Sequence, residues 1–324
     1  MPPLRPRKSP SADRRKRILP CFIVQTLCLT IMHDLFFRVA THTFRVTLHH
    51  DPELDAQLAS YAPFATMPQT GTPLFTLTEY NGLTPDTEGF DEIGQFDCGG
   101  ANHGVYHNDS HYRFHISDTR KELTGVLECS HDFTSGRIRL YGKAPQRFFA
   151  LNNALMILFA FASAPHATLL VHAAVVRQAG RGYLFLGRSG TGKSTHARLW
   201  LRHIAGSDLL NDDNPVLVLA DGKATVYGSP WSGKTPCYRN ESAPVGAITR
   251  LEQAPQNLIR RERPVAAFAS LLSSCSTMIW DKATYDAICE TVSGMARVVP
   301  SYHLQCLPDA EAAQLCHQTV ACPS

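Results

Sequence analysis

Residues 187–194 have the types and spacing of a phosphate-binding loop. Gly187, Gly192, Lys193 and Ser194 fit the pattern G-x-x-x-x-G-K-[ST], in which glycines let backbone N–H groups converge on phosphate oxygens. The Lys193 ammonium would reach the terminal phosphates, and the Ser194 hydroxyl would bind Mg²⁺. The pattern therefore predicts binding of a nucleoside triphosphate, ATP with Mg²⁺. The residues expected to contact it are Gly187, Ser189, Gly190, Thr191, Gly192, Lys193, Ser194 and Thr195.

The sequence on both sides of this loop supports the same interpretation. An apolar strand is expected over 182–186 and a helix over 193–204, with Gly206 as its stop. A helix that begins at the loop directs its positive end at the anion. A glycine-rich turn without function would not require lysine and serine at these two positions.

Two adjacent carboxylates, Asp212 and Asp213, follow the expected helix. A kinase with such a loop needs a carboxylate near Mg²⁺ and a group that takes the proton of an acceptor hydroxyl. Adjacent carboxylates could divide these tasks, one facing the metal and the other the acceptor. A solvated acidic turn before Pro215 is the alternative, and the upstream loop favours the functional interpretation.

Three further residues are weaker candidates on their own. His172 lies in an expected strand over 168–176, where a lone histidine is usually structural. Lys234 and Arg239 lie in or after a stretch of turn formers at 228–236, and either cation could stabilise charge on a transferring phosphoryl group. That stretch alone fits a structural loop equally well.

In their order and approximate spacing, His172, residues 187–194 and the Asp212–Asp213 pair resemble the kinase domain of HPr kinase/phosphorylase. That family shares its P-loop fold with phosphoenolpyruvate carboxykinase. Residues 228–234 are similar to a branch of HPr-kinase-like proteins described as serine kinases. The resemblance to that branch extends along nearly the whole chain from about Met32 onward.

The resemblance implies roles for these residues. Lys193 and Ser194 would hold phosphates and Mg²⁺, Asp212 would lie near the metal, and Asp213 would be the base toward a serine-like hydroxyl. His172 would lie beside the acceptor or the base. The phosphorylase signature of the family is missing, and the N-terminal region does not resemble the regulatory domain of the bifunctional enzymes. Reversal by inorganic phosphate is therefore not expected, and HPr is not singled out as acceptor.

The elements that must position these residues fall into two groups. Alternating strands over 40–145 predict a β-rich N-terminal domain with an antiparallel sheet, and turn formers predict a surface loop over 84–100. A buried helix is expected over 146–162, and an α/β pattern follows from residue 168. The expected fold is α/β, with a P-loop domain of the HPr-kinase and phosphoenolpyruvate-carboxykinase type after an N-terminal β-rich (α+β) domain. The expected domains are 1–31, 32–145 and 146–324.

The expected strands of the first group are 43–49, 74–78, 111–117, 125–129 and 137–141. Those of the second are 168–176, 182–186, 215–219, 225–227, 247–251 and 302–306. Further helices are expected over 264–272, 281–298 and 309–319, the last with Asp309 as its N-cap.

Composition narrows the class of protein. The chain has 324 residues and 44% hydrophobic residues, which allows a sizeable core. Seven basic residues and Asp13 lie among the first 17, so this tail carries about +6 and the remainder about −3 of the net +3. The mildly acidic remainder argues against nucleic-acid binding. The ten cysteines are scattered without zinc-ligand spacing, which is typical of reduced thiols in a cytoplasmic protein.

The N-terminus resembles a signal peptide in part. A basic stretch precedes an apolar run over 18–32, which is short for a membrane span, and no small-x-small cleavage site follows. The preferred interpretation is an extension over 1–31 that is not native, with Met32 as a possible start. A signal anchor is the alternative.

The sequence thus predicts an ATP-dependent serine kinase in the cytoplasm, with ATP and Mg²⁺ as cofactors. The acceptor is expected to be a hydroxyl on a protein, peptide or small molecule. No nucleic-acid or membrane partner is expected, and a homo-oligomer is possible, as in the related kinases. A P-loop ATPase or nucleotide-dependent switch, and a nucleotide-binding module that recognises a partner, are the alternatives.

Overall fold

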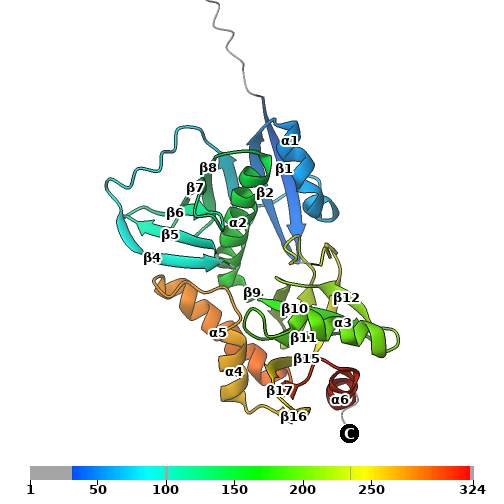
Figure 1. Cartoon of the computed structure of the whole chain (residues 1–324). Coiled ribbons are helices and arrows are strands. Elements are labelled where there is room, and N and C mark those ends of the chain that lie inside the picture. The colour runs from blue at the N-terminus through cyan, green and yellow to red at the C-terminus, as the bar shows by residue number, and fades with distance from the viewer. Residues whose placement is uncertain (1–30, 99–100, 234, 322–324) are drawn as a thin grey trace, which may run out of the picture. The chain divides into compact units, whose positions relative to one another are not determined.

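Two β-sheets organise the part of the chain that this computed structural model describes, residues 31–98, 101–233 and 235–321 (Figure 1). Both sheets belong to one unit, Met32–Ser324. The expectation of a non-native extension or signal anchor falls on residues outside those described. The division into domains at residues 145 and 146 stays a prediction.

The first sheet has eight strands in the order β1-β2-β3-β8-β7-β6-β5-β4. Alternate residues of β2 and β6 are buried, as the period-two pattern predicts, with Phe44, Val46 and Leu48 of β2 at or below 1% exposure. The strands are β1 (Met32–Val39), β2 (His42–His49), β3 (Thr76–Glu79), β4 (Asp91–Cys98), β5 (Ala101–His107), β6 (His111–Ser117), β7 (Leu123–Ser130) and β8 (Ser135–Leu140).

Two expectations for this sheet are wrong. The sheet is not purely antiparallel, because β3 pairs in parallel with both β2 and β8. The chain between β2 and β3 carries α1 (Pro52–Asp55) and η1 (Ala56–Phe64), so it crosses over instead of forming a hairpin. The expected surface loop over 84–100 contains β4, an edge strand with a bulge near Gly94. Acidic residues and glycine are tolerated in an edge strand, but in the sequence they are also typical of a loop, so the pattern does not indicate a strand.

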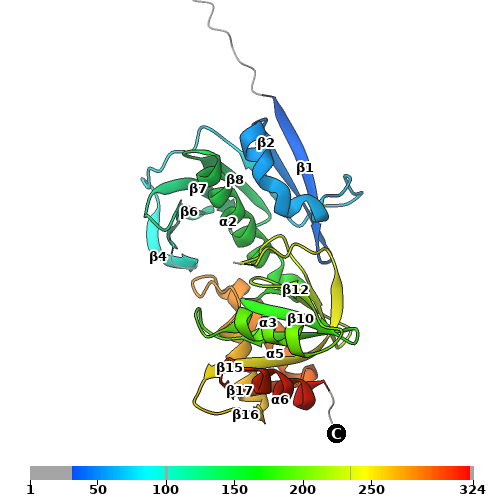
Figure 2. The same cartoon turned by 45° about the vertical axis from the view of Figure 1, so that its right-hand side comes forward.

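Helix α2 (Ala144–Ala162) packs against β6, β7 and β8, and Ser163 is its C-cap, as its apolar sequence predicts (Figure 2). The helix is buried over most of its length, and one hydrophobic cluster includes residues of the first sheet, of α2 and of the second sheet. In the described part of the chain, no helix is both long and apolar enough to cross a membrane.

The second sheet has the order β12-β10-β11-β15-β14-β13-β9, with β17 beside β15 and β16 beside β17. Strand β11 is parallel to β15, and β15 to β17. The strands are β9 (Thr168–Leu170), β10 (Ala173–Gln178), β11 (Arg181–Leu186), β12 (Asp208–Asn211), β13 (Val216–Ala220), β14 (Lys223–Tyr227), β15 (Ser242–Gln253), β16 (Leu258–Arg261) and β17 (Ser301–Cys306).

Helices cover both faces of the parallel part of this sheet (Figure 1). Tyr183 and Phe185 of β11 point into a cluster with α3 (Lys193–His203) and α6 (Ala310–Val320). The alternate residues Leu184 and Leu186 join the cluster that holds α5 (Lys282–Val298), against which α4 (Pro264–Leu272) packs. The structure is therefore a mixed α/β fold with helices on both sides of a sheet.

The continuous strand expected over 168–176 is wrong, because the chain breaks into β9 and β10 at Val171 and His172. Strand β9 pairs with β13, whereas β10 pairs with β11 and β12. The break is held by backbone hydrogen bonds from His172 N to Ser274 O at 2.7 Å and from Ala173 N to Asp213 O at 2.9 Å. His172 thus lies where the chain passes from one strand to the other.

Candidate functional site

The loop over 187–194 connects the end of β11 to the start of α3. Gly190 and Gly192 have φ angles of 82° and 108°, which L side chains rarely adopt, and no described atom lies within 4 Å of a Cβ built on either residue. Glycine is therefore required there for backbone conformation and not for space. Gly192 is the N-cap of α3, and among the described residues no side chain caps this helix. The first N–H groups of α3 thus lack intrahelical partners at a loop suited to an anion.

Lys193 is almost completely buried at the start of α3, with 8% of its surface exposed. Its Nζ donates to Gly187 O at 2.8 Å and to Arg188 O at 3.4 Å, and lies 2.8 Å from His172 Nε2. Burial lowers the pKa of Lys193, and the carboxylates of Asp213 and Asp212 oppose that shift. Both carboxylates therefore lie close enough to act on this ammonium.

His172 connects Lys193 to Asp213. Its Nδ1 lies 3.0 Å from Asp213 Oδ1, and its Nε2 faces the Lys193 ammonium. An ammonium can only donate, so Nε2 is the acceptor and the ring proton belongs on Nδ1, which donates to Asp213. The predicted residues His172, Lys193 and Asp213 are thus brought into one hydrogen-bonded chain, although 21 residues separate the first two.

Asp212 differs from its neighbour. It is 6% exposed, and both of its carboxylate oxygens are buried without a hydrogen-bond partner among the described residues. A buried carboxylate without a partner is costly, so this pair of oxygens suits a cation. No group of three or more His, Cys, Asp or Glu in the described part of the chain could hold a metal. Asp212 therefore fits an ion that takes one protein carboxylate, a hydroxyl such as that of Ser194 and the oxygens of phosphates, as Mg²⁺ does.

The turn that carries the acid pair is held by neighbours that sequence reasoning missed. Asn211 Oδ1 accepts from Asp213 N at 2.9 Å, and Asn211 Nδ2 donates to Ser229 Oγ at 3.1 Å. The Ser229 hydroxyl donates to Asn214 O at 2.6 Å. A Cβ built on Gly233 would lie 3.1 Å from Asp212 O. These contacts hold the backbone of the acid pair against residues 228–233, and nothing in the sequence pattern signals them.

Of the two remaining candidates, the structure describes only Arg239, which does not join this cluster. Lys234 lies outside the described residues. Arg239 Nη1 lies 2.7 Å from Asp208 Oδ2, and Arg177 binds the same carboxylate. Arg239 thus has Asp208, at the start of β12, as its ion-pair partner, and its catalytic role stays a prediction.

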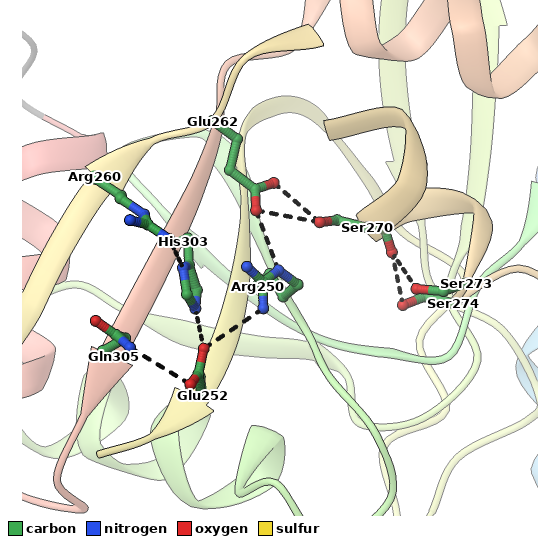
Figure 3. A network of polar contacts seen from close by, with 9 residues as sticks. All are labelled: Arg250, Glu252, Arg260, Glu262, Ser270, Ser273, Ser274, His303 and Gln305. Carbon is green, nitrogen blue, oxygen red and sulfur yellow. Dashed lines mark hydrogen bonds and ion pairs between the residues drawn. The ribbon is translucent and has the colours of Figure 1, made fainter. Parts of the chain in front are cut away.

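A polar network lies at the carboxyl ends of β15 and β17 (Figure 3). Glu262 accepts from Arg250 Nε at 3.1 Å and from the Ser270 hydroxyl at 3.0 Å. The Ser274 hydroxyl donates to Ser270 O at 3.2 Å, and Ser274 O accepts from His172 N. The network therefore connects β15 to the backbone of His172. At the end of β15, Gln253 Nε2 donates to Gly190 O and Thr191 O, both at 3.3 Å, which holds the glycine loop.

Residues 142–309 match the family model for the SynChlorMet cassette protein ScmC. The chain belongs to the ScmC family. The ScmC match includes the loop, both carboxylates and His172, so every predicted site residue lies within it. All eight strands of the first sheet lie outside the ScmC match.

A solved structure of the Hpr(Ser) kinase/phosphatase from Coxiella burnetii is 15% identical in sequence to this chain. The likeness covers 47% of this chain and 93% of that one, with a TM-score of 0.28, which is too low to carry a structural argument. A search of curated proteins finds no match.

Proposed function

We propose that this ScmC-family protein is an ATP-dependent kinase that transfers the γ-phosphate to a serine-like hydroxyl in the cytoplasm. The observation that carries the proposal is the chain Asp213–His172–Lys193, which joins a carboxylate to the loop lysine through a histidine of fixed tautomer. Such a chain places a proton acceptor beside the group that would hold the terminal phosphates. The proposal includes a P-loop domain of the HPr-kinase type.

Each proposed site residue has a separate task in the phosphoryl transfer. The acceptor oxygen forms a bond to the γ-phosphorus, the bond between that phosphorus and the β–γ bridging oxygen breaks, and ADP leaves. Asp213 takes the hydroxyl proton, because Oδ1 is occupied by His172 and no described group hydrogen-bonds Oδ2. Lys193 and the free N–H groups of α3 bind phosphate oxygens.

Mg²⁺ would neutralise charge on the phosphates when it is bound. Asp212 and the Ser194 hydroxyl are the groups proposed to hold it, since the buried carboxylate of Asp212 has no described partner. Catalysis on this scheme is positioning and charge stabilisation rather than covalent chemistry of the protein.

The test compares wild type with Asp213→Asn, using γ-labelled ATP, Mg²⁺ and two acceptors, a capped serine and the proteins of a cell extract. Loss of the base should reduce label transfer about 10²-fold or more. MgATP affinity should stay within about threefold, because Asp213 does not hold phosphate. Asp221→Asn, in the exposed turn between β13 and β14, is the matched control and should behave as wild type.

Three other results would contradict the proposal. Phosphate release that no acceptor alters would indicate an ATPase or a switch. MgATP binding without turnover would indicate a recognition module. Normal label transfer by Asp213→Asn would show that Asp213 is not the base.

A further inference from the structure

A small cavity lies directly beside Asp213. Its volume is about 110 Å³, and it is lined by Asp213, by Trp231 and Tyr238 of the following loop, by Asn152 of α2 and by Ser60 of η1. One water molecule needs about 10–15 Å³ of such space, so the cavity admits a group of several non-hydrogen atoms. The cavity therefore has the dimensions of a side chain or of a small compound.

The donor that the cavity offers is fixed by a chain of hydrogen bonds. Trp231 Nε1 lies 2.9 Å from the Tyr61 hydroxyl, which lies 2.9 Å from Asn152 Oδ1. The indole N–H can only donate, so the Tyr61 oxygen accepts from it and gives its own proton to Asn152 Oδ1. The Asn152 amide is thereby oriented with Nδ2 away from Tyr61, and its one described contact is a long 3.9 Å approach to Met156 Sδ. One of the two N–H groups of Nδ2 thus remains to donate to a bound molecule.

A second polar group of the lining lacks a described partner. Ser60 is 7% exposed, and its hydroxyl oxygen is buried without a hydrogen bond in the described part of the chain. A buried hydroxyl without a partner is costly unless a ligand or water satisfies it. Together with Asn152 Nδ2, it gives the cavity two groups that can hydrogen-bond a ligand.

The charge of the lining restricts the ligand. Asp213 is the one charged side chain among the described lining residues, and no described lysine or arginine reaches the cavity. An anionic ligand would meet the Asp213 carboxylate with no lysine or arginine among the described lining residues to offset the repulsion, and a cationic one would pair with it and disfavour its protonation. An uncharged group with a hydroxyl and a hydrogen-bond acceptor satisfies Asp213, Ser60 and Asn152 together.

We infer that this cavity is the acceptor site and that it takes an uncharged alcohol of the size of a serine side chain, held by Asn152 and Ser60 with its hydroxyl at Asp213. The inference rests on the proposed kinase function and narrows its substrate class. The alcohol oxygen bonds to the γ-phosphorus of ATP, ADP leaves, and the alcohol proton passes to Asp213.

The test is ligand-observed NMR with N-acetyl-L-serine amide, N-acetyl-L-alanine amide and D-glycerate on the full chain. Capped serine should bind at least about tenfold more tightly than capped alanine, because the alanine probe leaves polar groups unpaired. Asn152→Asp keeps the acceptor for Tyr61 but removes the N–H donor, and should weaken capped serine about tenfold. Met156→Phe should fill the cavity and abolish binding.

Met67→Phe is the matched control, because Met67 is 77% exposed and does not line the cavity. Thermal melting of each variant confirms that it is folded. The inference is overturned if capped serine binds no better than capped alanine, if Met156→Phe leaves its binding intact, or if D-glycerate binds more tightly. Displacement of a fluorescent ATP analogue by MgATP is measured on the same samples. If MgATP does not displace the analogue, the proposed kinase function is wrong. The NMR result then still tests whether the cavity binds an uncharged alcohol.

Discussion

Lys193 uses all three of its N–H donors within the protein, toward Gly187 O, Arg188 O and His172 Nε2. A phosphate that binds this ammonium must therefore replace one or more of these acceptors. The contact of His172 Nδ1 with Asp213 does not involve Lys193, so it can persist when Lys193 binds a phosphate. The histidine is thus a positioning residue for the carboxylate.

Substitution of His172 separates its two hydrogen bonds. Asparagine places an amide near the position of Nδ1 and keeps a donor for Asp213, whereas glutamine reaches toward the position of Nε2 and loses that donor. We expect kcat to fall about tenfold in His172→Asn and about 10²-fold in His172→Gln, with KM for ATP changed less than about threefold in both. Steady-state kinetics with a competent acceptor measures both values. Equal losses in the two variants would contradict a role through Asp213.

The phosphate-loop motif and the adjacent carboxylates single out Lys193 and the acid pair in the sequence, and the family resemblance adds His172; their roles stay predictions. The sequence could not predict that His172 bridges the other two, since this depends on the break between β9 and β10. The roles of Asn211 and Ser229 were also not predictable. Their side chains act through contacts between residues 18 positions apart, and neither residue belongs to a pattern.

At the scale of elements, the site depends on where α3 begins. The loop needs left-handed backbone at Gly192, and Gly206 after the same helix has a comparable φ of 73°. Neither position has a described atom within 4 Å of an added Cβ. The two glycines therefore have the same open steric surroundings, but only Gly192 belongs to the proposed phosphate-binding loop.

Gly192→Ala and Gly206→Ala form a matched pair. Each should lower the free energy of unfolding by about 1 kcal/mol, because alanine is strained at positive φ. Gly192→Ala alone should weaken MgATP binding, by about tenfold or more, since the N–H groups of the loop would be displaced. Chemical denaturation and calorimetric titration test the two effects. Equal loss of MgATP affinity in both variants would argue against nucleotide binding at this loop.

Elements with strong local signals were predictable from the sequence. Strands whose pairing depends on residues far away in the sequence were not. Helix α4 and the N-cap of α6 at Asp309 lie where the sequence predicts them. Strands β1, β5 and β16 were missed. Strand β3 was assigned without its parallel partners, because pairing across a crossover leaves no periodic trace in the chain.

At the scale of the whole molecule, one buried and one partly buried histidine couple stability to pH. Burial lowers the pKa of His196 in α3 to about 4, and burial together with the charge of His166 lowers the pKa of His42 in β2 to about 4. His42 Nε2 lies 2.9 Å from Thr168 Oγ1, which connects the first sheet to β9. Both rings are therefore neutral in the folded protein near neutral pH.

The sign of the effect follows from proton uptake. Between about pH 6.5 and 4 the unfolded chain binds protons at these histidines that the folded protein does not, so the free energy of unfolding falls as the pH is lowered. The expected loss is roughly 2–3 kcal/mol for each histidine by pH 4. Urea unfolding at pH 7, 5.5 and 4 should show it. His42→Gln and His196→Gln should each reduce the slope, and slopes equal to that of wild type would contradict the assignment.

The hydrogen bond between Trp231 and Tyr61 joins segments 170 residues apart. Tyr61 and Ser60 precede the ScmC match, whereas the loop, His172 and the acid pair lie within it. A protein that shares only residues 142–309 would therefore keep every group proposed to contact nucleotide and lose one wall of the cavity. Acceptor choice could then diverge through changes around η1, while the nucleotide-binding residues stay constant. A chimera that exchanges this segment between relatives would move acceptor preference without altering the response to ATP.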